Sequence, residues 1–378
     1  MQEVVDGLCS FAARGACTDA ERRAAVWLHD ELRSRVHEAW VETRWVRPRR
    51  AAVLALGCLL AVVGSLLSTA VHVAGLVLAA IGAVSLAVEA AGFLGPIRAL
   101  FPRRATQHVL TAVPDEGVVL AITAPYDAPR RGLVLNDRWR APLRRVPPWM
   151  LAVCGAVAAA AAAARVADYE PGWLGAVQLV PTLALLLAMA AAADVALSAV
   201  SPGANDDASG VAVAIALFDE LERRPPRTLR PTVLFTGAGH AVPRSAARHL
   251  RAEGLGAERV MLLELGPCGA GRPSWNARHP QVRAAAERAA QALGVVDGPR
   301  PRRAAARVPS IRIACLDERG ISPRAHQEDD TPDHVDRRAM TAALDLALGV
   351  VDALDAQLSG STPSSTRSAT GSSTEHDP

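Results

Sequence analysis

The chain has 378 residues and a formal net charge of +3, and half of its residues are hydrophobic. This hydrophobic share is high for a soluble enzyme and indicates membrane-embedded segments, while the near balance of acids and bases disfavours a nucleic-acid partner. All 41 basic residues are arginine. The absence of lysine excludes a P-loop, a pyridoxal Schiff base and other lysine chemistry.

The N-terminal segment reads as part of a soluble domain. Thr18 to Glu21 forms a capping box, and the residues after it place Leu28 and Leu32 on one face of an amphipathic helix. The first fifteen residues lack the charged-then-apolar pattern of a secretion signal, so no cleaved leader is expected. The six cysteines form no C-x-x-C pair, so neither a zinc ribbon nor a disulfide framework is expected.

Two apolar blocks interrupt the chain. Residues 51–88 contain no charged side chain, which is enough for two membrane spans of about 20 residues each, and we assign 51–95 to a first transmembrane hairpin. A second hairpin is expected over 146–199, where a short charged turn, Asp168 to Glu170, separates two uncharged runs. The sequence therefore predicts four spans. The alternative for the alanine-rich third span is a buried helix of the soluble domain.

Arginine distribution gives the expected orientation. Arginines precede the first span, follow the second and precede the third, whereas the turns between paired spans carry only Arg165. By the positive-inside rule, we expect a multi-pass protein of the cell inner membrane whose soluble domain and both termini are cytoplasmic. A transporter or channel is less favoured, because the ionisable residues Glu89 and Asp194 lie near span ends.

The remaining segments, 1–48, 103–145 and 200–356, are expected to form one soluble domain. Helix and strand patterns alternate along them, which predicts an α/β domain with a mostly parallel sheet. The strands are expected at 117–123, 232–236, 260–265 and 310–315, and the later helices at 208–223, 244–253, 282–293 and 338–354. Residues 357–378, rich in Ser, Thr and Pro, are expected to be a disordered tail.

Polar residues gather after several of these strands, where α/β proteins build their sites. The turn Gly203-Ala-Asn-Asp-Asp-Ala-Ser-Gly leads into an apolar helix, and a later loop, 325–336, holds two histidines and five carboxylates. Between them, Phe235-Thr-Gly-Ala-Gly-His ends one strand, and Glu264 interrupts another that is otherwise apolar. A loop so rich in charge is costly to bury unless it is solvated or binds metal.

These four regions, in this order, resemble those of the co-catalytic zinc aminopeptidases, metallopeptidase family twenty-eight, whose relatives include glutamate carboxypeptidases and glutaminyl cyclases. That family has a G-x-N-D-x-x-S-G turn, a strand end F-T-G-A-E-E, a later strand with Asp or Glu, and an H-T-x-x-D-T loop. The segment from Gln107 to Gly132 is similar to the family's first strand and its A-H-Y-D turn. The resemblance implies a three-layer fold that is interrupted here by the two hairpins.

The resemblance also implies roles for individual residues. Asp206 would be the carboxylate that bridges two zinc ions, Glu264 the other carboxylate of the first zinc, and His326 an imidazole of the second. Asp127 would lie in the outer shell and orient the ligands.

Three positions depart from the family pattern. Pro125 stands where the family has a zinc-binding His, Gly239 replaces the general-base Glu, and His240 replaces a Glu that binds the second zinc. The first zinc would keep only Asp206 and Glu264, which is too few ligands. The second site would keep Asp206, His240 and His326, a set that suits one zinc with an open position.

We therefore expect a membrane-anchored, zinc aminopeptidase-like protein that is catalytically impaired and acts as a binding or regulatory module, with peptide or membrane-protein termini as partners. The alternative enzyme is an exopeptidase that uses a single zinc at Asp206, His240 and His326, with a base displaced to Asp207, Glu328 or Asp329. The simplest alternative has no metal: Asp206 caps a helix, His240 ends a strand, and His326 is solvated.

Overall fold

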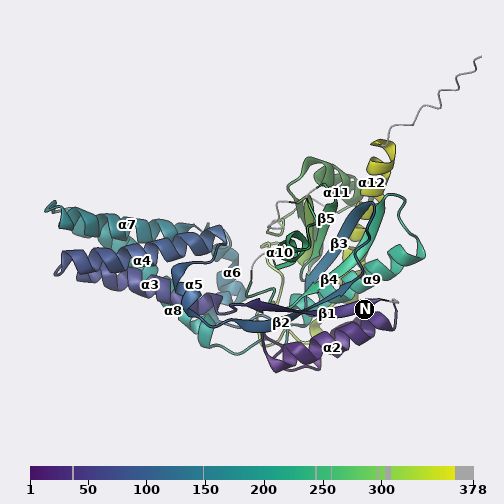
Figure 1. The fold of residues 1–378 in the computed structure, drawn as a ribbon, viewed down its shortest axis with the longest axis horizontal. Coiled ribbons are helices and arrows are strands. Elements are labelled where there is room, and N and C mark those ends of the chain that lie inside the picture. The colour runs from purple at the N-terminus through teal and green to yellow at the C-terminus, as the bar shows by residue number, and fades with distance from the viewer. Residues whose placement is uncertain are drawn as a thin grey trace, which may run out of the picture.

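The computed structural model describes residues 1–35, 38–147, 149–242, 245–256, 258–295, 298–302 and 308–361. An elongated bundle of apolar helices projects from one side of an α/β domain, as Figure 1 shows. The domain is assembled from the three predicted soluble segments, so both helical hairpins are insertions within it. The predicted disordered tail, 357–378, is wrong for its first five residues, which belong to a helix that ends at Ser361, and the rest of it lies outside the described residues.

The α/β domain is built on a seven-stranded sheet with the order β1-β2-β4-β3-β5-β7-β6. The four central strands are parallel, whereas β1, β2 and β6 pair with their neighbours in antiparallel fashion. The strands are β1 (Ala39–Val46), β2 (Arg104–Thr111), β3 (Val118–Pro125), β4 (Leu229–Thr236), β5 (Val260–Leu265), β6 (Arg272–Ala277) and β7 (Ser310–Leu316). The predicted mixed α/β fold is confirmed, with antiparallel edges that the sequence analysis did not include.

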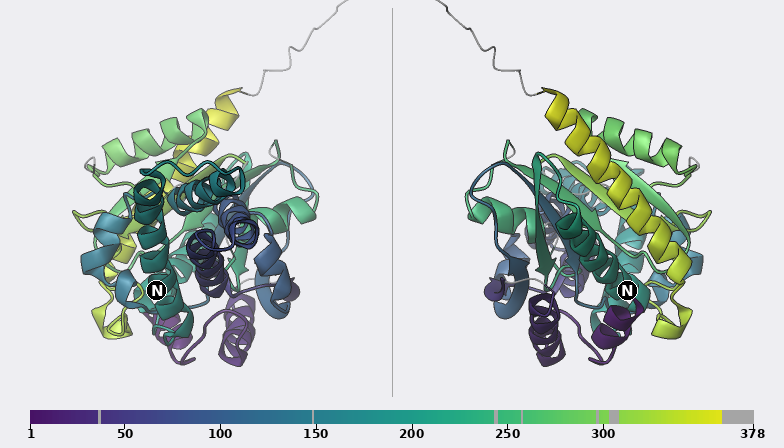
Figure 2. Two further views of the ribbon diagram at one scale, coloured as in Figure 1. Left: turned by 90° about the vertical axis from the view of Figure 1, so that its left-hand side faces the viewer. Right: turned by 90° about the vertical axis from the view of Figure 1, so that its right-hand side faces the viewer.

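Helices cover both faces of the sheet. One face carries α1, α2, α9, α11 and α12, the last two side by side in Figure 2, and the other face carries α10. These helices are α1 (Gln2–Cys9), α2 (Asp19–Arg33), α9 (Gly210–Arg223), α10 (Ser245–Ala252), α11 (Pro280–Ala292) and α12 (Arg337–Ser361). The predicted capping box exists, because the Thr18 side chain accepts a hydrogen bond from the Glu21 amide at the start of α2.

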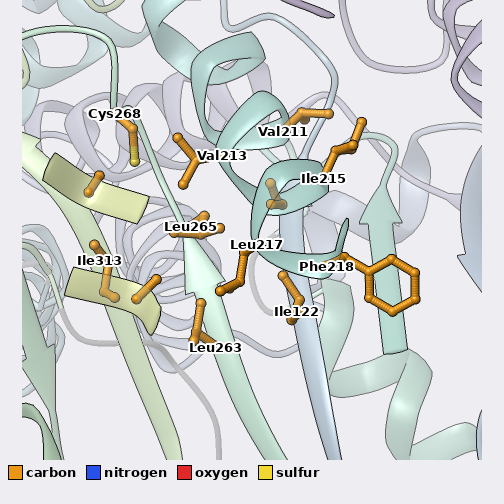
Figure 3. Packing of buried hydrophobic residues seen from close by; sticks show 14 of the residues in the cluster. Ile122, Val211, Val213, Ile215, Leu217, Phe218, Leu263, Leu265, Cys268 and Ile313 are labelled. Atoms are coloured by element: carbon orange, nitrogen blue, oxygen red, sulfur yellow. The ribbon is translucent and has the colours of Figure 1, made fainter. Parts of the chain in front are cut away.

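The main core lies between the sheet and α9. Figure 3 shows Val213 and Leu217 of this helix packed over Ile122 of β3 and Leu263 of β5. These side chains are at most 1% exposed. Burial of this kind contributes about 1.5–3 kcal/mol per large apolar side chain, and it fixes the start of α9 against the strand ends.

The bundle consists of α3 (Arg50–Leu67), α4 (His72–Ala91), α7 (Met150–Val166) and α8 (Leu174–Leu197), and short helices α5 (Pro96–Leu100) and α6 (Asp137–Leu143) join it to the domain. Three of the four, α3, α4 and α8, are long and apolar enough to cross a membrane. The fourth, α7, has 17 residues and falls below that length. The structure therefore has three candidate spans and one shorter apolar helix where four spans were predicted.

Candidate metal centre

Two parallel strands, β3 and β4, end at one edge of the sheet and lead into polar turns, and a third turn lies beside them. After β3 comes Asp127, which is fully buried, and after β4 the chain turns through Gly239 to His240. The turn that precedes α9 brings Asp206 to the same place. The strand ends thus assemble side chains from three separate stretches of sequence, as expected for an α/β site.

Asp206, His240 and His326 lie together. The Nε2 atom of His240 is 3.0 Å from one carboxylate oxygen of Asp206, and Nε2 of His326 is 3.5 Å from the other. The Nδ1 atom of His326 is 2.9 Å from the Arg130 carbonyl oxygen, which can only accept, so this nitrogen carries the proton. His326 therefore presents an unprotonated Nε2 to the centre, as metal-binding histidines do.

Asp127 orients His240 in a similar manner. One of its oxygens lies 3.5 Å from Nδ1 of His240, and the carboxylate also accepts hydrogen bonds from the amides of Gly239 (2.7 Å) and His240 (3.3 Å). A carboxylate behind a ligand histidine is the arrangement that fixes imidazole rings at metal sites. Asp127 thus lies next to His240, and the outer-shell role expected for it stays a prediction.

The charges in this cluster are strongly coupled. Burial opposes ionisation of Asp206, but the neighbouring imidazoles of His240 and His326 hold its pKa well below the usual value. Burial likewise opposes protonation of His240, yet Asp206 and Asp127 raise its pKa well above the usual value. Without a metal ion, His240 is thus an imidazolium between two carboxylates.

Asp207 is a further residue that could take part in binding a cation. Its side chain, Asp206 and His240 offer ligand atoms that all lie within 4.8 Å of one another. Within the described part of the chain, no hydrogen-bond donor reaches either oxygen of Asp207, although the residue is 1% exposed. Burial and the charge of Asp206 raise its pKa well above the usual value. Because such orphaned oxygens are unfavourable, the donor set fits one bound cation at this position.

Glu264 has a different partner from the predicted zinc. Its carboxylate lies 3.0 Å from the Arg312 guanidinium, and the two residues are direct register partners on β5 and β7. Glu264 is the main cause of a raised Arg312 pKa, and Asp207 and Asp206 add to it. A Cβ at Gly266 would lie 3.2 Å from Arg312, so glycine leaves room for the guanidinium. The positive charge next to Glu264 is thus supplied by the Arg312 guanidinium.

The other two departures are sterically linked. A Cβ atom at Gly239 would lie 2.5 Å from the Cβ atom of Pro125, a separation that side chains do not tolerate. A side chain at position 239 would therefore require the turn after β4 to shift away from the end of β3.

No model of a known protein family matches the sequence, and no curated protein matches it. Solved structures do. The glutaminyl cyclase of an Acidobacteriales bacterium superposes with a TM-score of 0.52 at 12% identity, over 94% of each chain. BSAP, a zinc aminopeptidase from Bacillus subtilis, gives 0.52 at 12% over 93% of each chain. A leucine aminopeptidase precursor from Bacteroides thetaiotaomicron gives 0.53 at 13%, over 93% of this chain and 95% of that one.

The fold is that of zinc aminopeptidases and glutaminyl cyclases. At these identities the likeness shows the fold alone, so we call residues 1–48, 103–145 and 200–356 the aminopeptidase-like domain and argue its chemistry from its own residues. The sequence analysis predicted this fold from the order of the four motifs.

Glu21, which was predicted only as part of a capping box, contacts the turn that carries His240. Its buried carboxylate accepts hydrogen bonds from the amide of Ala238 (2.6 Å), the amide of Cys17 (2.9 Å) and the hydroxyl of Thr106 (3.0 Å). The first of these bonds holds the turn that carries Gly239 and His240. Burial is the main cause that raises the pKa of Glu21 to about 8, with Asp127 adding to it.

The stability of the aminopeptidase-like domain is expected to fall as the pH rises from about 4.5 to about 8. Over this range folded Glu21 retains a proton that the unfolded chain has already lost, and stability decreases with pH wherever the folded state binds more protons. Thermal unfolding of the full chain in detergent, followed from pH 5 to pH 8, measures this slope. The variant Glu21→Gln is expected to flatten it, and an unchanged slope in that variant would contradict the assignment.

Proposed function

We propose that this protein is a membrane-anchored, zinc aminopeptidase-like protein with an impaired catalytic centre, which acts as a binding or regulatory module. The observation that carries the proposal is the ion pair between Arg312 and Glu264, 3.0 Å apart at the first zinc position. A guanidinium balances carboxylate charge, but it has no open coordination position at which to activate water. The two-metal chemistry of the fold is therefore lost.

The missing general base supports the same proposal. Gly239 has no side chain, and a general base contributes about 10²- to 10⁴-fold to such reactions. The substitutes considered from the sequence are all engaged or enclosed: Glu328 pairs with Arg131 at 2.8 Å and Asp329 with Arg324 at 3.3 Å. Asp207 is almost completely buried. Glu328 and Asp329 are thus held in ion pairs, and Asp207 is the one substitute of the three whose oxygens have no donor among the described residues.

One metal ion at the second site is part of the proposal. Asp206, His240 and His326 supply a carboxylate and two imidazoles, and Asp127 and the Arg130 carbonyl orient the two rings. Zinc bound there would polarise a carbonyl or hold a peptide terminus. The same three ligands also favour the second candidate function, an exopeptidase with a single zinc ion. That enzyme would need a general base other than residue 239.

Membrane anchoring is supported by the surface of the helical bundle. Large apolar side chains along it are exposed, among them Val77 and Ile81 of α4 and Val180 and Leu187 of α8. Such a surface is stable in lipid but not in water. Exposed aromatic residues mark both ends, with Trp149 at the end near the domain and Trp173 at the far end, as in the aromatic belts of membrane proteins.

The arginines that flank the bundle support an inner-membrane protein with the aminopeptidase-like domain in the cytoplasm. Because the second hairpin enters the chain between Asp127 and Asp206, the site lies on the side of the domain that adjoins the bundle. Peptide termini close to the bilayer, including those of membrane proteins, are the partners that this placement suits.

Metal content tests the proposal directly. Mass spectrometry of the detergent-purified chain is expected to find one zinc ion per chain, and none in Asp206→Ala or His326→Ala. His334→Ala, in the same loop but hydrogen-bonded to Thr331 and outside the cluster, is the matched control and should keep the wild-type content. Two zinc ions per chain would contradict the role given to Arg312.

A peptidase screen separates the two candidate functions. The zinc-loaded chain is expected to release no N-terminal residue from a panel of unblocked peptides above the rate of the Asp206→Ala variant. Turnover that requires zinc and disappears in that variant would replace the impaired module with the single-zinc exopeptidase.

A further inference from the structure

A second feature of the site is a pocket lined by several arginines. It has a volume of about 350 Å³, adjoins Asp206, His240 and His326, and extends away from them between α6 and the end of β7. This volume lies within the range of small-molecule pockets. Four arginines line it: Arg140, Arg144, Arg302 and Arg312.

The charges around this pocket do not balance. Arg312 pairs with Glu264 and Arg140 with Asp137, at 3.0 and 3.1 Å. Arg144 contacts the carbonyl oxygens of Gly320 and Arg300, which are neutral groups. Across the described residues, neither Arg144 nor Arg302 lies within 4.0 Å of a carboxylate, and Asp206 is the one acidic residue in the lining.

Arg144 and Arg302 also influence one another. Burial, and then the positive charge of Arg302, lower the pKa of Arg144, while the negative charge of Asp317 raises it. An anion beside the two guanidinium groups would reduce their repulsion and form charge-assisted hydrogen bonds.

Exposed apolar side chains lie beside the wall of the pocket. Val134 and Leu135 line the pocket, while the adjoining Leu133 is 80% exposed. On α6, Arg140 lines the pocket and Trp139, its neighbour, is 53% exposed. This helix leads directly to α7, so apolar exposed groups and arginines meet where the bundle joins the domain.

We infer that this pocket binds a phosphate group through Arg144 and Arg302, supplied by an anionic membrane lipid or by a free phosphomonoester. The lipid source rests on the proposed membrane anchoring, whereas the phosphate site itself does not. A ligand bound here would reach the metal centre with its remaining part, because both share one pocket.

Calorimetric titration of the full chain in neutral detergent with sn-glycerol 3-phosphate tests the site. A chelator is present so that the anion cannot bind through a metal ion, and glycerol serves as the uncharged probe. Binding is expected for the phosphate and not for glycerol. It should weaken tenfold or more in Arg302→Gln, whose exposed side chain can be changed without disturbing the fold, and in Arg144→Gln/Arg302→Gln.

The control variant Arg22→Gln/Arg223→Gln loses two exposed arginines elsewhere, which are 59% and 69% exposed, and should bind as the wild type does. Equal weakening in the control, or no binding of the phosphate by the wild type, would overturn the inference. Binding to lipids in nanodiscs identifies the source of the phosphate. If the wild type retains phosphatidylglycerol over phosphatidylcholine and Arg302→Gln does not, the ligand is a lipid. If the wild type shows no such preference but binds glycerol phosphate, the ligand is the free ester. A positive peptidase screen would leave these results unaffected.

Discussion

Replacing Arg312 with methionine is expected to destabilise the aminopeptidase-like domain by about 2–4 kcal/mol, because Glu264 would keep a partly buried charge without a partner. The loss should exceed that of an ordinary apolar substitution of similar volume, since Asp206 and Asp207 also interact with the guanidinium. Denaturant unfolding of the full chain in mild detergent measures it.

The double variant Glu264→Gln/Arg312→Met provides the control. Because the double variant has no unpaired ion, its free energy of unfolding should exceed that of Arg312→Met by about 1–3 kcal/mol. If the single and double variants unfold at the same denaturant concentration, the two residues are not coupled and Arg312 does not take the place of a cation at this position.

The central part of the fold could be predicted because it is apolar on both faces. The expected strand at 117–123 overlaps β3, and the strand at 260–265 coincides with β5. The edge strands β1 and β6 were missed, since the residues of β1 are exposed or half-buried, β6 has only two buried residues, and both strands carry polar side chains. Their strand character comes from pairing with β2 and β7, which a local pattern does not contain.

The sequence motifs predicted which residues of the site lie close together, but not all of their partners. Asp206, His240 and His326 meet as the motif order implies, but the partner of Glu264 was not foreseen. A signal was present: Arg312 is the one charged residue of β7, just as Glu264 is of β5, and opposite charges within two buried strands have to compensate one another. Pairing them requires the strand order, which only the structure gives.

Arg14 shows how a residue with no local signal can organise a site. Its guanidinium is 1% exposed and has no carboxylate within ion-pair distance among the described residues. Instead it donates to four carbonyl oxygens, those of Leu8 (3.1 Å), Tyr126 (2.7 Å), Pro202 (3.0 Å) and Gly203 (2.7 Å). These bonds join α1 to the segment before Asp127 and to the turn before Asp206.

Arg14→Met is therefore expected to destabilise the domain by about 3 kcal/mol or more, because four buried carbonyl groups lose their donor at once. Since the same bonds position the turns of Asp127 and Asp206, any zinc bound by the wild type should be lost at lower chelator concentration in this variant. Arg22→Met, on the exposed face of α2, is the matched control and should leave both properties nearly unchanged. If Arg14→Met is as stable as the wild type, the four carbonyl groups find other donors, and Arg14 does not hold Asp127 and Asp206 together.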